Sequence, residues 1–103
     1  MCGIYLYNSA NQSISIKTIK QTIKQIQHRG QDSYGILYKT NDNNLEVTSF
    51  KGCIIDSDED TITSSTYLAH LRYRTSGYNT SRGSQPIVSE NKFGKFAFVF
   101  NGN

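Results

Sequence analysis

The sequence predicts an α+β fold of mostly antiparallel strands with one clear amphipathic helix. Two observations support this class. Isoleucines recur at spacings of three, four and three residues, as on the buried face of a helix, at Ile16, Ile19, Ile23 and Ile26. Elsewhere, short runs rich in aromatic and β-branched residues alternate with Asn, Asp and Gly, which is typical of strands joined by turns.

The first elements follow from local signals. Residues 3–7, Gly-Ile-Tyr-Leu-Tyr, predict a strand. Ser15 precedes the isoleucine stripe and is expected to cap the helix, because a serine hydroxyl accepts a hydrogen bond from a free amide of the first turn. Gly30 follows the last turn and is expected to end the helix in the left-handed conformation, with His28 and Arg29 favouring the negative helix end.

A hairpin and further strands are expected after the helix. Residues 33–39 predict a strand, 41–44 (Asn-Asp-Asn-Asn) a turn, and 45–51 the returning strand. The later expectations are an exposed acidic loop or short helix start at 56–60, a strand over 66–73, a polar loop over 74–84, and two short strands, 87–89 and 96–100, around 91–95.

Composition excludes several function classes. The 103 residues suit a single small domain, and 11 basic against 8 acidic residues give a net charge of +3 that is spread along the chain. Lys17, Lys20 and Lys24 are expected to form a solvated helix face rather than a nucleic-acid patch. Cys2 and Cys53 form neither a disulfide framework nor a metal-binding pattern. No segment resembles a membrane span or signal peptide. We therefore expect a cytoplasmic protein without metal, cofactor, nucleic-acid or membrane partner.

Cys2 is the first candidate site residue. If Met1 is removed, Cys2 carries both a thiol and a free α-amine, and an amine that titrates near 7.7–8 can accept the thiol proton at neutral pH. The alternative is that Cys2 opens a buried first strand, since cysteine is among the most buried residue types.

Three further segments carry polar groups, each with an alternative. Residues 27–33 are either a helix end or part of a site. In a strand, His70, Arg72 and Arg74 share one face, which suits a carboxylate ligand but also a charged edge strand. Asn101-Gly102 is a turn signal, or a side-chain amide and a backbone N–H aimed at one oxyanion.

Taken in order, these segments resemble one family over the whole chain. The chain resembles the glutaminase domain of class II glutamine amidotransferases, which are N-terminal nucleophile hydrolases, and within them most resembles the amidophosphoribosyltransferases of purine biosynthesis. Asparagine synthetases and the glucosamine-6-phosphate-forming transaminase share the cysteine and Asn-Gly but differ around the arginines. The matching motifs are Met1-Cys2-Gly3-Ile4, Gln27 to Gly35, His70-x-Arg72-Tyr73-x-Thr75-x-Gly77, Gln85-Pro86 and Asn101-Gly102-Asn103.

The resemblance implies a fold and an activity. Residues 1–103 would be a single, partial type-2 domain, the N-terminal part of a four-layer αββα sandwich. It would hydrolyse glutamine to glutamate and ammonia through a cysteinyl thioester, with no cofactor. In the full purine enzyme the ammonia goes to phosphoribosyl pyrophosphate, so the expected partners are a phosphoribosyltransferase domain, absent here, or a second copy in a homo-oligomer.

The resemblance also implies a role for each matching residue. The loop 73–83 would close over bound glutamine, and His70 and Asp32 would be structural. The site roles are Cys2 as nucleophile with its α-amine as base, Asn101 and Gly102 as the oxyanion hole, Arg72 and Thr75 in glutamine binding, and Arg29 and Gly30 orienting the N-terminus.

Two departures from the family pattern suggest a second function. The sequence stops at Asn103, before the aspartate that binds the α-amine of glutamine in relatives, and Phe100 stands where relatives commonly carry a histidine. The alternative function is therefore a truncated, inactive relative that acts as a glutamine-binding or partner subunit.

Overall fold

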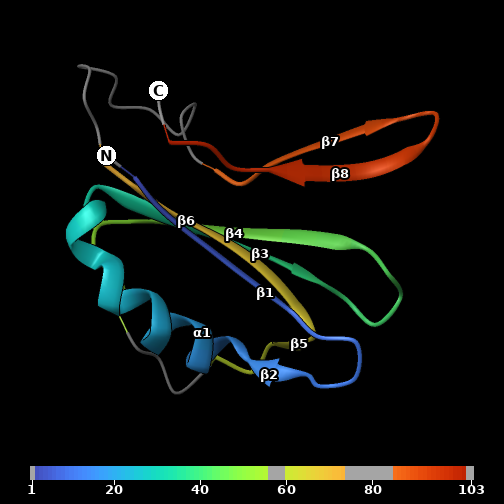
Figure 1. The fold of residues 1–103 in the computed structure, drawn as a ribbon, viewed down its shortest axis with the longest axis horizontal. Coiled ribbons are helices and arrows are strands. Elements are labelled where there is room, and N and C mark those ends of the chain that lie inside the picture. The colour runs from blue at the N-terminus through green and yellow to red at the C-terminus, as the bar shows by residue number, and fades with distance from the viewer. Residues whose placement is uncertain (1, 56–59, 74–84, 102–103) are drawn as a thin grey trace.

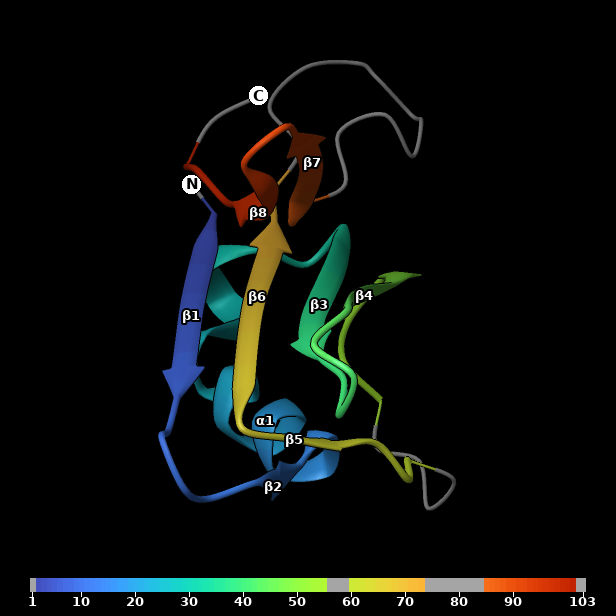
Figure 2. The same ribbon diagram turned by 90° about the vertical axis from the view of Figure 1, so that its right-hand side faces the viewer.

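The structure, a computed structural model, describes residues 2–55, 60–73 and 85–101. Its main sheet holds four antiparallel strands in the order β1-β6-β3-β4, which Figure 2 shows side by side. Two smaller antiparallel pairs are β2–β5 and β7–β8. The strands are β1 (Gly3–Asn8), β2 (Ile14–Ser15), β3 (Ser33–Lys39), β4 (Leu45–Lys51), β5 (Thr63–Ser64), β6 (Thr66–Arg72), β7 (Ile87–Asn91) and β8 (Gly94–Phe98).

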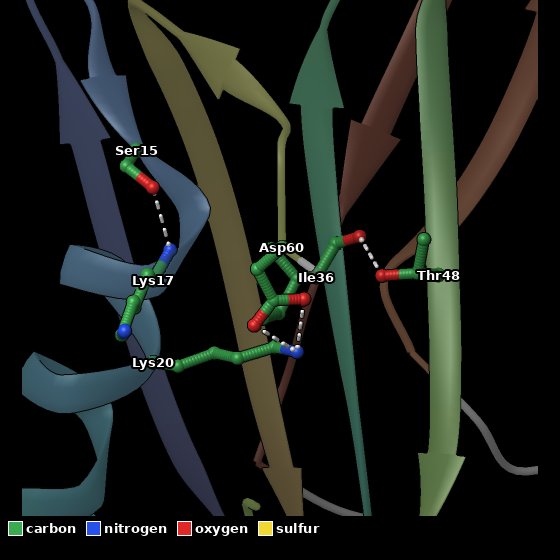
Figure 3. A network of polar contacts seen from close by, with 6 residues as sticks. All are labelled: Ser15, Lys17, Lys20, Ile36, Thr48 and Asp60. Atoms are coloured by element: carbon green, nitrogen blue, oxygen red, sulfur yellow. Dashed lines mark hydrogen bonds and ion pairs between the residues drawn. The ribbon is translucent and has the colours of Figure 1, made fainter. Parts of the chain in front are cut away.

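The helix α1 (Ile16–Ile23) covers one face of the main sheet, and the β7–β8 hairpin lies on the opposite side (Figure 1). The α+β class with mostly antiparallel strands and one amphipathic α-helix is confirmed for the described residues. Ser15 caps α1 as predicted, because its Oγ accepts from the Lys17 amide at 3.1 Å (Figure 3). Among the described helices, none is both long enough and apolar enough to cross a membrane.

The core lies between α1 and the strands. Ile16, Ile19 and Ile23 are at most 2% exposed. Burying each such side chain contributes about 1.5–3 kcal/mol to the stability of the fold. They pack with Tyr67, Ala69 and Leu71 of β6. Because side chains alternate along a strand, Leu68, His70 and Arg72 face the other way, toward the hairpin side. The core thus fixes which face of β6 carries the polar residues.

The helix end differs from its prediction. α1 stops at Ile23 and continues as a 3₁₀ helix, η1 (Lys24–Arg29). Gly30 has φ −167° and ψ 122°, so it is extended and the predicted left-handed helix end is wrong. Glycine is needed there for space, because a Cβ on Gly30 would lie 2.4 Å from the carbonyl carbon and oxygen of Leu71.

Two expectations about charge were also wrong. The Lys20 side chain, expected on a solvated face, is 4% exposed, and that of Asp60, expected in an exposed loop, is 16% exposed. The Lys20 Nζ lies 3.0 Å from each Asp60 carboxylate oxygen (Figure 3). Residues 56–59 of that predicted loop lie outside the described residues. Charges distant in sequence therefore meet beside the core.

The strand predictions were mostly confirmed. β1, β3, β4 and β6 lie within one residue of their predicted bounds, and β3 and β4 form the predicted hairpin. The last hairpin turns more tightly than expected, between Asn91 and Gly94, so β7 is longer than predicted and β8 begins and ends earlier. The sequence did not indicate the two-residue strands β2 and β5. Residues 74–84, predicted as a polar loop, lie outside the described part.

The position of β6 excludes one alternative for its charged face. β6 pairs with β1 on one side and β3 on the other, so it is an interior strand. The alternative of an exposed edge strand guarded by charges is therefore wrong. The polar residues of β6 instead lie at the centre of the sheet.

Candidate functional site

Three predicted site residues meet at the start of β1. Cys2 is 4% exposed, and its backbone N–H donates to Asn101 Oδ1 at 2.8 Å. The Cys2 carbonyl oxygen accepts from Arg29 Nε at 3.0 Å. Both backbone groups of Cys2 are therefore held by side chains, one from the end of η1 and one from beyond β8.

Two more predicted residues lie at the same end of the sheet. Gly3 pairs with Leu71, so the antiparallel register places Arg72 opposite the position of Cys2. Arg72 is half-buried and shares a strand face with His70. Gly30 packs against the backbone of Leu71 and Arg72. The sheet therefore brings Cys2, Arg72 and Gly30 to one edge of the core.

Gly30→Ala is expected to destabilise the fold by about 1–3 kcal/mol, because the added methyl group would overlap the fixed backbone of β6. Urea unfolding followed by circular dichroism measures this. Gly3→Ala is the matched control, since its Cβ would meet only side-chain atoms of Ile26 and Leu71, at 3.2 Å or more, which can shift. An equal or smaller loss at Gly30 than at Gly3 would contradict the steric argument.

The residue before Asn101 is held on both sides by buried polar side chains. The Phe100 carbonyl lies 3.1 Å from His70 Nε2, and a carbonyl can only accept, so the imidazole carries its hydrogen on Nε2. The Phe100 N–H donates to Gln85 Oε1 at 2.7 Å. His70 and Gln85 are 1% and 3% exposed. Both contacts fix the segment that carries Asn101.

The electrostatics of His70 favour the neutral ring. Burial lowers its pKa and outweighs the hydrogen bond to the Phe100 backbone, which raises it, while the nearby positive charge of Arg72 acts in the same direction as burial. Its Nδ1 has no hydrogen-bond partner among the described residues. A second ring proton would therefore be placed on a buried atom with nothing described to accept it.

Gln85 and Gln27 were given no role in the sequence analysis. Gln27 joins two segments, since its Nε2 donates to the Gly30 carbonyl at 2.5 Å and its Oε1 accepts from the Ile54 amide at 2.9 Å. Both glutamines stood in motifs of the family resemblance, but their partners are set by tertiary packing. No local pattern could have identified them.

The remaining predicted residues stand as follows. Thr75 and Gly102 lie outside the described residues, as does Arg74.

The burial of Cys2 fits both interpretations of that residue, as the opening of a buried strand and as a nucleophile held in place. Cys2 and Cys53 are both free thiols. Within the described ranges, no three His, Cys, Asp or Glu side chains gather as metal ligands would.

Comparison with known proteins adds a family-level likeness, although no family model matches the chain. It is 28% identical to the amidophosphoribosyltransferase of Archaeoglobus fulgidus over 107 residues, covering 100% of this chain and 23% of that protein. It is 34% identical over 82 residues to the chloroplastic amidophosphoribosyltransferase 3 of Arabidopsis thaliana, covering 76% of this chain and 15% of that enzyme.

A second kind of enzyme is equally similar. The glutamine–fructose-6-phosphate aminotransferase of Oceanobacillus iheyensis is 34% identical over 105 residues, covering 99% of this chain and 17% of the relative. The chain therefore spans between 15% and 23% of the length of these relatives. The proteins to which it is similar along its length are thus class II glutamine amidotransferases.

Proposed function

We propose that this protein is a type-2 glutamine amidotransferase domain that hydrolyses glutamine to glutamate and ammonia, with Cys2 as the nucleophile. The observation that carries the proposal is the 2.8 Å hydrogen bond between the Cys2 nitrogen and Asn101 Oδ1, across 99 residues of sequence. It joins a candidate nucleophile to a candidate oxyanion-hole residue. Similarity to class II amidotransferases supports the same chemistry.

The nucleophile would be activated by its own nitrogen. With Met1 removed, the Cys2 nitrogen is an α-amine, which takes the thiol proton as sulfur attacks the side-chain amide carbon of glutamine. The same proton then goes to the leaving nitrogen, and ammonia departs from a cysteinyl thioester. Water attacks the thioester, which releases glutamate and returns the thiol.

Asn101 and Gly102 would stabilise the tetrahedral oxyanion. The Asn101 acceptor is occupied by the Cys2 nitrogen, so its NH₂ end serves as the donor to the substrate. The Gly102 N–H would supply the second donor. Arg29, through its bond to the Cys2 carbonyl, would fix the direction of the terminus, and Gly30 would let that segment approach β6.

Substrate recognition would fall to the end of β6. Arg72 lies beside the Cys2 position, where its guanidinium fork suits the α-carboxylate of glutamine, and Thr75 would complete that contact. Residues 1–103 would form part of an N-terminal nucleophile hydrolase sandwich in the cytoplasm. Its partners would be a phosphoribosyltransferase domain, which would use the ammonia, or a second copy of the chain in a homo-oligomer.

Alkylation of Cys2 by a glutamine analogue tests the proposal. Incubation with diazo-oxo-norleucine is expected to modify Cys2, and incubation with glutamine to release ammonia at a rate that rises with pH through about 7.7–8, where the α-amine loses its proton. Intact mass and peptide mapping locate the adduct and show whether Met1 is removed. A Cys53→Ser background removes the exposed thiol as a competing target.

The inactive alternative predicts the opposite result. Glutamine would bind without ammonia release, and Cys2 would stay unmodified by the analogue. That outcome would overturn the hydrolase proposal and support a glutamine-binding or partner subunit.

A further inference from the structure

We propose that His70 and Gln85 form a positioning pair that holds the Phe100 peptide and thereby aims Asn101 at Cys2. This proposal rests on the proposed function, since it explains how the oxyanion-hole residue is kept in place. The hydrogen bonds described for these two side chains go to the Phe100 peptide and not to Cys2 or Asn101. They act through the backbone of the residue between.

Among the described residues, only His70 and Gln85 bind the backbone N–H and carbonyl of Phe100. β8 ends at Phe98, so Phe100 lies beyond the hydrogen-bond ladder of the hairpin. Phe100 is 40% exposed and is not part of the core cluster. Its peptide groups are instead satisfied by one buried donor, His70, and one buried acceptor, Gln85, at 3.1 and 2.7 Å. The orientation of the next residue, Asn101, follows from these two bonds.

Both members of the pair are themselves fixed to the main sheet. His70 lies in the interior strand β6, opposite Ile4 of β1 and Gly35 of β3. The Gln85 backbone approaches Gly35 so closely that a Cβ on Gly35 would lie 2.0 Å from the Gln85 carbonyl oxygen. Asn101 is therefore positioned relative to β6, the strand that pairs with β1, and β1 begins directly after Cys2.

The hydrogen-bonding groups of His70 and Gln85 suit the role of holding the Phe100 peptide in place. A neutral imidazole with hydrogen on Nε2 and a neutral amide present one donor and one acceptor, which match the two peptide groups. Neither places a net charge beside the developing oxyanion. Buried, fully directed hydrogen bonds of this kind restrict movement of the group they hold.

Matched variants test the pair. His70→Leu and Gln85→Met each remove one contact at similar volume and are expected to lower kcat for glutamine hydrolysis about 10- to 100-fold, because small misplacement of a catalytic group has effects of this size. KM for glutamine is expected to change less than about twofold, since substrate binding before reaction does not use the oxyanion donors. His70→Gln keeps a donor at the Nε2 position and is expected to recover most of kcat.

The controls repeat the same substitutions on exposed residues. His28→Leu in η1 and Gln21→Met in α1 are expected to leave kcat unchanged. Urea unfolding verifies that each variant is folded. If His70→Leu does not fold, Gln85→Met carries the test, because it removes the other bond to the same peptide.

A spectroscopic measurement separates this proposal from the proposed function. In ¹⁵N-labelled protein, the Asn101 side-chain amide resonance is expected to shift in His70→Leu and Gln85→Met but not in His28→Leu or Gln21→Met. Folded variants with an unchanged Asn101 resonance would overturn the positioning pair. Equal ammonia release from unaltered protein and from Cys2→Ser would instead overturn the proposed function, and the resonance would still decide the pair.

Discussion

Replacing Asn101 with leucine is expected to lower kcat for glutamine hydrolysis about 100- to 1,000-fold, the effect of losing one oxyanion-hole donor. The physical reason is that, in the proposed mechanism, the side-chain NH₂ would stabilise charge that develops only in the transition state. KM is expected to change little. Ammonia release under saturating glutamine measures the loss directly.

Asn101→Asp distinguishes the acceptor role of the Asn101 side chain from its proposed donor role. The carboxylate retains an acceptor for the Cys2 nitrogen but has no donor for the substrate oxygen, so it is expected to be as impaired as Asn101→Leu. Asn41→Leu, in the exposed β3–β4 turn, is the matched control and is expected to leave kcat unchanged. A kcat for Asn101→Leu within threefold of the unaltered protein would exclude the oxyanion role.

Asp60→Asn is expected to destabilise the fold by about 3–5 kcal/mol, since it leaves the buried Lys20 ammonium without its counter-charge. The total free energy of unfolding of a small domain is only about 5–15 kcal/mol. A large part of the population would therefore unfold under mild denaturant. The aromatic ring of Phe50, 5.1 Å from the Lys20 Nζ, offsets little of this loss. Urea unfolding at neutral pH gives the change in the free energy of unfolding.

The double variant Lys20→Met/Asp60→Leu provides the decisive comparison. Replacing both charges by apolar side chains removes the desolvation penalty together with the attraction, so its stability is expected to lie close to that of the unaltered protein. Glu46→Gln, an exposed carboxylate on β4, controls for general charge effects. A loss below about 1 kcal/mol in Asp60→Asn would mean that the pair behaves as a surface ion pair.

Most of the fold could be predicted because its signals are local. The isoleucine stripe and the Ser15 cap define α1 within two turns of chain, and alternation with turn residues locates the longer strands. Gly30 was misassigned because a glycine after a helix gives the same signal for a left-handed cap and for close backbone contact. Lys20 and Asp60 were placed in solvent because pairing across 40 residues has no local signal.

In the candidate site, too, features with a local sequence signal were predicted and features set by long-range packing were not. Cys2, Arg29 and Asn101 were predicted from sequence motifs and lie in contact. The support behind them was predicted only in outline: His70 was expected to be structural, but no partner was named for it, and Gln85 had no assigned role. Its bond to the Phe100 carbonyl depends on how a hairpin packs over an interior strand. Strand order and hairpin placement depend on residues far apart in sequence. The contacts that support the site residues are therefore visible only in the structure.

The hydrogen bond from Cys2 to Asn101 also sets an order of events during synthesis. At about 5–20 residues per second, the ribosome needs roughly 5 to 20 s to advance the 99 positions from Cys2 to Asn101. Throughout that interval the thiol exists without its amide partner. A nascent chain would thus carry a reactive cysteine before it could direct that cysteine toward glutamine. Under the proposed function, selectivity for glutamine would therefore be acquired only when Cys2 and Asn101 meet.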